Sequence, residues 1–305
     1  MESRSVPFTI AGIVCFSAAF ILGAGFWYFF GTNSRIFDGN NKTIVEMNSQ
    51  NEAEKNSNPV NSNAVIAITP TPFVKKAPAG EIAVTGGEVM LGGGQTKLPV
   101  RRVTVGDFAV GETEVSNAQY AEFIEATSRQ APNGWKDGKF SPGTGDEPVV
   151  GVTWDDANAY NKWLSEELDV TVRLPTEAEW VRAARGDTNY KYPWGGEWND
   201  EAAQSIEIKG KILPVRSLEA GRSPFGAYEM VGNVWEWTSD LAVDESGKPI
   251  LYEKTGQRII KGGSAKESRA YLTVSARAAR PENKPSELLG FRYVVVRNQP
   301  TGANF

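Results

Sequence analysis

The chain of 305 residues contains no histidine and only one cysteine, Cys15. Without an imidazole, it has no side chain whose ordinary pKa lies near neutrality and no nitrogen ligand for zinc, copper or iron. Serine-protease triads, cysteine–histidine dyads and histidine-based metal centres are therefore excluded. A single cysteine also excludes an intramolecular disulfide and a cysteine-ligated cluster. We expect no copper, iron or zinc cofactor.

An excess of positive charge is also missing. The chain has 32 Lys and Arg against 37 Asp and Glu, which gives a net charge of -5 and a pI of about 5.2. This balance argues against a general nucleic-acid binder. The length is sufficient for one or two domains with a sizeable core.

Residues 8–30 form a long apolar run without a charged side chain. At about 1.5 Å per residue, a helix of this length spans a bilayer core, and the aromatic block at its end suits the water–lipid interface. We therefore predict an uncleaved single-pass anchor after a short tail at 1–7. A cleaved signal peptide is the alternative, which the length of the run disfavours. Positive charge lies on both sides of the run, with Arg4 and the amino terminus before it and Arg35 and Lys42 after it, so it codes the orientation weakly. We expect the short tail inside and the large domain outside.

The rest of the chain divides by composition. Residues 31–79 are rich in Asn, Ser, Pro and Thr. They cannot bury enough apolar area to offset the entropy of ordering, so we predict a flexible stalk. Apolar residues, Gly and Trp rise from about residue 80, which indicates one globular domain over 80–297 and a tail at 298–305.

The globular part predicts a mixed α+β domain. Helices are expected to begin after Ser116, Thr153 and Thr176, because polar capping patterns are followed there by apolar residues at helical spacing. Short strands are predicted at Glu81–Val84, Arg101–Val105, Phe108–Gly111, 259–261 and 291–296. Gly-, Pro- and Asn-rich loops make up most of the remainder.

Nine segments, in order, resemble the formylglycine-generating enzyme, or sulfatase-modifying factor, family. The most specific is GAYEMVGNVWEW at 226–237. The others lie at 86–92, 99–105, 112–117, 148–157, 173–180, 192–195, 262–264 and 290–292. The resemblance implies a C-type-lectin-like fold with little regular secondary structure and a ligand face built by its C-terminal loops.

The chain departs from this family where the chemistry is expected. The resemblance implies two catalytic cysteines shortly after the Gly-Gly-Ser turn, but their positions are occupied by Glu267 and Leu272. Copper(I) prefers soft sulfur ligands, and a carboxylate with an isobutyl group cannot replace them. Formylglycine generation is therefore not expected. A related branch that uses iron held by histidines is excluded by the absence of histidine.

Other positions of the family's pocket persist. Trp235, Ser264, Arg269 and Tyr271 match residues that line or neighbour it, so they indicate either a retained ligand pocket or residues needed for packing. Glu267 is open to two interpretations. It is a buried acid and proton acceptor, or a solvated loop residue.

The resemblance also implies a calcium site. Its ligands would be the side chains of Glu229 and Glu236 with the carbonyls of Gly232 and Val234, a mixed oxygen set that suits calcium. Two carboxylates this close in a folded loop would repel each other unless a cation or a base lies between them. The alternative is that Glu236 bonds local amides.

Two functions follow from these observations. The first is a membrane-anchored, extracytoplasmic accessory or binding protein with a catalytically inactive domain. It would sit in a bacterial inner membrane with the domain in the periplasm or outside the cell. A protein of an envelope or signalling complex is the expected partner, and a glycan or small ligand is the alternative. The second is a cysteine-independent oxidoreductase or maturation enzyme with Glu267 as its base.

Overall fold

The computed structural model describes residues 80–92, 98–244 and 247–297. The predicted tail, anchor, stalk and C-terminal tail lie outside these ranges. Within them, no helix is both long enough and apolar enough to cross a membrane.

Three helices begin where the sequence predicts. They are α1 (Asn117–Thr127), α2 (Trp154–Leu168) and α3 (Glu177–Arg185), and each starts with a complete capping box. The caps satisfy backbone N–H groups that the first turn leaves without partners. A short 3-10 helix, η1 (Glu219–Gly221), is the one further helical element of the described residues.

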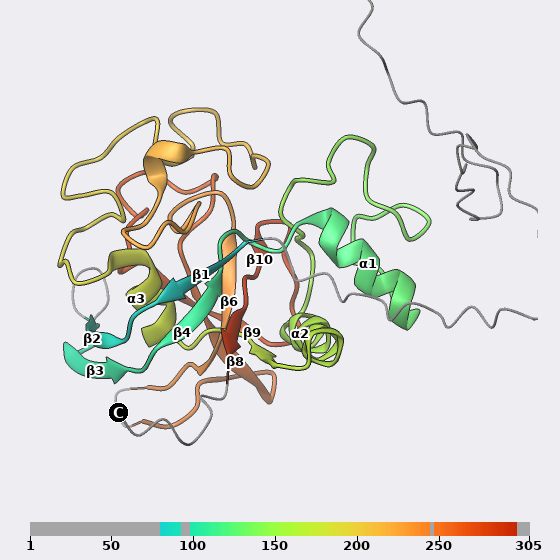
Figure 1. The fold of residues 1–305 in the computed structure, drawn as a ribbon, viewed down its shortest axis with the longest axis horizontal. Helices are drawn as coiled ribbons and strands as arrows, with labels where there is room; N and C mark the ends of the chain where they lie inside the picture. The colour runs from blue at the N-terminus through green and yellow to red at the C-terminus, as the bar shows by residue number, and fades with distance from the viewer. Residues whose placement is uncertain (1–79, 93–97, 245–246, 298–305) are drawn as a thin grey trace, which may run out of the picture. The chain divides into compact units, whose positions relative to one another are not determined.

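Three sheets carry the rest of the regular structure (Figure 1). The first has the order β1-β4-β11-β5, and β1 and β11 both pair antiparallel with β4. The second has the order β10-β6-β8-β7, with β9 also pairing with β8, and β2 pairs with β3 in a third. The strands are β1 (Glu81–Val84), β2 (Gly87–Leu91), β3 (Arg101–Val105), β4 (Phe108–Gly111), β5 (Thr171–Arg173), β6 (Trp235–Leu241), β7 (Leu251–Tyr252), β8 (Thr255–Lys261), β9 (Arg277–Pro281), β10 (Leu289–Gly290) and β11 (Val294–Val296).

The first three strand predictions are confirmed, and the fourth lies within the longer β8. The predicted strand at 291–296 is wrong over its first half, because β11 covers only Val294–Val296. The carbonyls of Phe291 and Tyr293 instead accept hydrogen bonds from the N–H groups of Val115 and Gly111. Arg292, between them, points into the interior.

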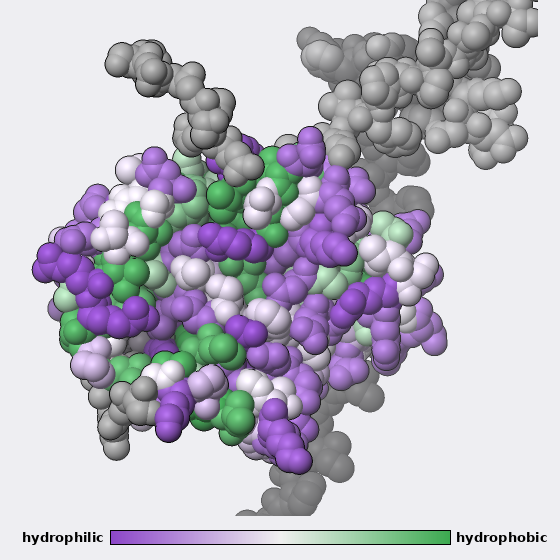
Figure 2. Space-filling view, turned by 90° about the horizontal axis from the view of Figure 1, so that it is seen from below, coloured by the Kyte–Doolittle hydropathy of each residue, from purple (hydrophilic) through white to green (hydrophobic). Residues whose placement is uncertain are grey.

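Two apolar clusters form the core. One joins α3 to β2 and β3, and the other joins α1 and α2 to β5 and β11. Figure 1 shows α3 on one side of the sheets and α1 with α2 on the other. Tyr120, Phe123 and Tyr160 pack ring against ring in the second cluster. On the face drawn in Figure 2, apolar and polar groups are interspersed.

Candidate functional site

Glu267 lies at the centre of the predicted pocket residues. Its carboxylate accepts a hydrogen bond from the Trp235 indole N–H (Oε1, 2.8 Å) and another from the Ser264 hydroxyl (Oε2, 2.8 Å). Trp235 begins β6, and Ser264 follows the end of β8, so two paired strands deliver the donors. Glu267 and Trp235 are both half-buried. The side chain is therefore neither a fully buried acid nor a freely solvated loop residue.

The turn before Ser264 requires glycine. Gly262 and Gly263 both have positive φ angles, 92° and 78°. A Cβ on Gly263 would lie 2.4 Å from Cδ2 of Leu272. Leu272, at the second expected cysteine position, is fully buried and belongs to the α3 core cluster. The second cysteine position of the family is therefore occupied here by an apolar side chain that is part of the core.

Arg269 and Tyr271 do not share the hydrogen bonds that join Glu267 to Trp235 and Ser264. Both side chains are exposed, Tyr271 by 61%. Within the described ranges, no hydrogen bond links either side chain to Glu267. The two residues belong to the exposed surface beside Glu267, which we call the rim. There Glu207 accepts hydrogen bonds from the Ser268 hydroxyl (2.5 Å) and the Arg269 N–H (3.1 Å). These hydrogen bonds lower the pKa of Glu207 to about 2.

The predicted calcium ligands lie in a buried polar network. Glu236 is fully buried, and its carboxylate accepts from Arg292 Nε (2.7 Å) and Nη2 (2.8 Å) and from the Trp180 indole (2.8 Å). Glu229 accepts from the backbone N–H groups of Arg216 and Leu218, at 3.1 Å each. Both carboxylates therefore already have protein donors.

The fit of calcium to these residues is poor as the side chains stand. Among the described residues, no group of three or more carboxylate or thiol side chains is placed to hold a metal ion. The base that the two carboxylates require is Arg292, which bonds to Glu236 directly. Calcium binding at Glu229, Gly232, Val234 and Glu236 stays a prediction.

A third buried acid, Glu114, was not singled out by the sequence. One carboxylate oxygen accepts from the Asn233 amide (3.0 Å), and the other has no partner in the described part of the chain. Burial, and then the charge of Glu229, raise the pKa of Glu114 well above its ordinary value. Burial likewise raises the pKa of Glu229. Three buried carboxyl groups thus surround one buried guanidinium, and Glu114 is the group best placed to hold a proton.

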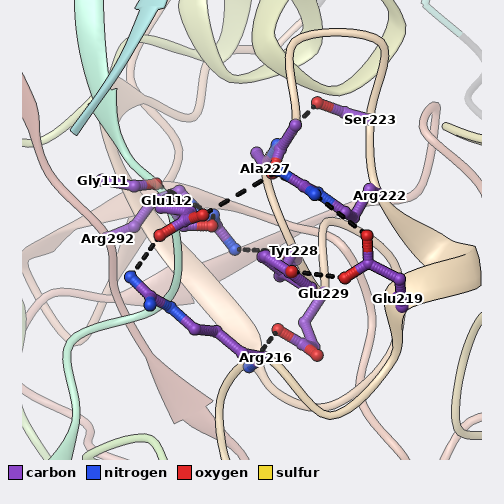
Figure 3. A network of polar contacts seen from close by, with 11 residues as sticks. Gly111, Glu112, Arg216, Glu219, Arg222, Ser223, Ala227, Tyr228, Glu229 and Arg292 are labelled. Carbon is purple, nitrogen blue, oxygen red and sulfur yellow. Dashed lines mark hydrogen bonds and ion pairs between the residues drawn. The ribbon is translucent and has the colours of Figure 1, made fainter. Parts of the chain in front are cut away.

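Figure 3 shows the ion pairs and hydrogen bonds of the neighbouring loop at 216–225. Glu112 forms ion pairs with Arg216 and Arg222, and the Tyr228 hydroxyl donates to Glu219 (2.5 Å). Arg292 donates to the Tyr228 carbonyl at 2.9 Å, within GAYEMVGNVWEW itself. The loop before this segment is therefore held by charge pairs and by Tyr228, and the start of the segment is held from inside by Arg292.

The sequence of this domain matches one family of known proteins. The chain belongs to the family described as the sulfatase-modifying factor enzyme 1-like domain, whose model matches residues 68–298. It is 29% identical to the formylglycine-generating enzyme of Streptomyces coelicolor, over 75% of this chain and 95% of that enzyme.

Other relatives carry different names. The chain is 29% identical to hercynine oxygenase of Mycolicibacterium smegmatis, over 63% of this chain and 54% of the relative. It is 28% identical to a serine/threonine-protein kinase of Chlamydia caviae, over 69% of this chain and 37% of the kinase. The chain thus spans about half of the oxygenase and about a third of the kinase.

Solved structures show the same fold. PvdO from Pseudomonas aeruginosa matches with a TM-score of 0.57 at 22% identity, over 70% of this chain and 93% of that one. Variable protein 1 of Treponema denticola matches with a TM-score of 0.58 at 23% identity, over 70% and 94%. The mixed helix-and-sheet fold predicted from the sequence is therefore confirmed for the described domain.

Proposed function

We propose that this domain is a catalytically inactive member of its family that binds a protein partner. The observation that carries the proposal is the replacement of the expected thiol pair by Glu267 and Leu272. Leu272 is packed in the core, and both oxygens of Glu267 are held by Trp235 and Ser264. The chain's one cysteine, Cys15, lies outside the family match, so no thiol of the domain can hold copper(I).

The rim beside Glu267 supports a binding role. Tyr271 and Ile206 expose apolar surface, by 61% and 56%, and Arg269 and Lys266 are exposed cations. Aromatic and Arg side chains are frequent anchors of protein interfaces. The backbone beneath them is ordered, because the Ile206 N–H donates to the Glu267 carbonyl at 3.0 Å. A fixed surface of this kind lowers the entropy cost of binding.

The setting we propose is the outer face of a bacterial inner membrane. The apolar run at 8–30 would anchor the chain, and residues 31–79 would act as the stalk. The partner would belong to an envelope or signalling complex. The matched segment of the Chlamydia kinase supports a signalling partner, because there a domain of this kind is part of a longer chain.

Site-specific photo-crosslinking in intact cells tests the binding role. A photoreactive phenylalanine analogue would replace Tyr271 in the full-length chain, and the same analogue would replace Tyr252, a tyrosine 44% exposed on β7, as the matched control. We expect one specific envelope protein crosslinked from the first position and not from the second. No product from Tyr271, or the same products from both positions, would overturn the proposal.

The alternative function is an enzyme that does not use cysteine. The contacts of Glu267 support it only through position, because Trp235 and Ser264 hold a half-buried carboxylate at a fixed place where the family's chemistry is expected. Trp235, Ser264 and Tyr271 would shape the site, and the oxygenase relative shows that enzymes with other names share the family's sequence. Glu267→Gln keeps the size and one carbonyl oxygen but removes the basic group. An unchanged cellular phenotype in this variant would eliminate the enzyme and leave the binding role intact.

A further inference from the structure

A second group of charged side chains gathers where the C-terminal end of α3 meets β2, β8 and β9. Arg185 ends α3, Lys261 ends β8, and Arg277 begins β9. Two adjoining hollows meet there and share Met90 and Arg185 in their walls. The outer hollow has a volume of about 180 Å³ and the inner one about 10 Å³. The inner space suits about one water molecule, while the outer space suits a small solute.

Positive charge exceeds negative charge in the inner hollow. Lys261 and Arg277 are directly opposite each other in the β8–β9 ladder, where like charges are destabilising. Glu177 bridges them, 3.5 Å from Lys261 Nζ and 3.1 Å from Arg277 Nε. Burial, together with Arg277 and Arg185, lowers the pKa of Lys261 to about 8. One carboxylate and three cationic side chains thus line the inner hollow.

Arg185 has no counter-charge of its own. Its Nε is buried without a hydrogen-bond acceptor, and no carboxylate of the described residues forms an ion pair with its guanidinium. Two acids in the outer wall are already engaged, Glu88 with Arg102 (3.0 Å) and Asp187 with Arg182 (2.6 Å). The Nε atom is closed to solvent, but the side chain as a whole is half-exposed, lines both hollows and has no carboxylate partner among the described residues. Its exposed part is therefore suited to an external anion.

We propose that this cleft binds a small tetrahedral oxyanion, phosphate or sulfate, with Arg185 as its principal donor. The fork of a guanidinium matches two oxygens of such an anion, and the hydrogen bonds are strengthened by charge. Lys261 and Arg277 supply the positive field behind it. The site is separate from Glu267 and does not depend on the binding function proposed for that surface.

Titration calorimetry with inorganic phosphate and with sulfate tests the site, on the purified full-length chain in a mild detergent at constant ionic strength. We expect saturable one-to-one binding of both oxyanions, with a gain in thermal stability that sodium chloride does not reproduce. Arg185→Gln should weaken phosphate binding by about tenfold or more, as expected for the loss of a charged donor. Lys162→Gln, which removes one positive charge from the exposed face of α2, should leave it unchanged.

If Arg185→Gln does not fold, Arg185→Lys takes its place, because it keeps the charge and removes the fork. We expect weaker but measurable phosphate binding in that variant. Equal stabilisation by chloride would show a general ionic effect and overturn the proposal. Equal phosphate affinity in the parent chain and the folded Arg185 variant would also overturn it, as would the absence of binding in the parent chain.

Discussion

Arg292→Met would remove the only cationic group that bonds directly to the buried carboxylate of Glu236 in the described structure. Arg292 is completely buried and uses all three guanidinium nitrogens. Nε and Nη2 donate to Glu236, Nη2 also donates to the Tyr228 carbonyl, and Nη1 donates to the carbonyls of Gly111 (3.2 Å) and Glu112 (3.4 Å). Methionine has a similar reach but no donor.

The expected loss of stability is large. Breaking a buried ion pair by removing one partner costs about 3–5 kcal/mol, because a buried charge is left without compensation. The backbone carbonyls that lose a donor add roughly 1 kcal/mol or more. Against a total stability of about 5–15 kcal/mol, the variant should be marginally folded. Glu236→Gln should cost less, because the Trp180 indole can still donate to the amide oxygen.

A double-mutant cycle in urea separates the pair from its surroundings. Unfolding would be followed by the fluorescence of the nine tryptophans. We expect the free energy of unfolding lost in the double variant, Glu236→Gln with Arg292→Met, to be smaller than the sum of the two single losses. The difference should be about 2 kcal/mol or more. Arg292→Lys, which keeps the charge without the fork, is the control and should lie between the parent and Arg292→Met. A loss below about 1 kcal/mol for Arg292→Met, or additive single losses, would refute the reasoning.

Three further predictions concern stability. Glu114→Gln should stabilise the protein at pH 7. Burial raises the pKa of Glu114, so the stability of the parent protein falls as pH rises above about 4.5. The free energy of unfolding in urea should therefore fall less between pH 5 and pH 7 in the variant than in the parent protein. The stability of the parent protein should rise between about pH 8 and 10.5, because Lys261 loses its proton at a lower pH in the folded state than in the unfolded state. Lys261→Met should remove that rise, and an equal rise in both proteins would contradict the prediction. Thr176→Ala should cost about 1 kcal/mol or more in thermal unfolding and Thr176→Ser much less, since Thr176 caps the Glu179 N–H at 3.1 Å; equal losses would contradict this.

Local rules predicted the helices well. A capping box involves residues three positions apart, so the pattern after Ser116 or Thr176 contains its own hydrogen-bond partners. The same rules missed β6, Trp235–Leu241, because Glu236 and Thr238 read as polar although both are buried. Their partners come from elsewhere: Arg292 pairs with Glu236, and Thr238 donates to the Ile259 carbonyl at 2.9 Å. A polar residue with a distant partner has no signature in its own segment.

The candidate site divides in the same way. Trp235, Ser264 and Glu267 were predicted as pocket residues, and the structure brings their side chains into contact. Arg269 and Tyr271 were predicted with them, but they lie exposed on the rim. Glu114 carried no sequence signal, because a loop glutamate gives no indication that it will be buried beside two other acids.

The sequence by itself determined which chemistry is missing: the chain has no histidine, and its one cysteine lies outside the domain. It also determined the family and the starts of the helices, because motifs and caps are short-range patterns. Only the tertiary structure decided that Leu272 fills the core, that two donors hold Glu267, and that Arg185 is left without an acceptor. The physical reason is that burial and charge pairing depend on segments far apart in the chain, as with Glu236 and Arg292.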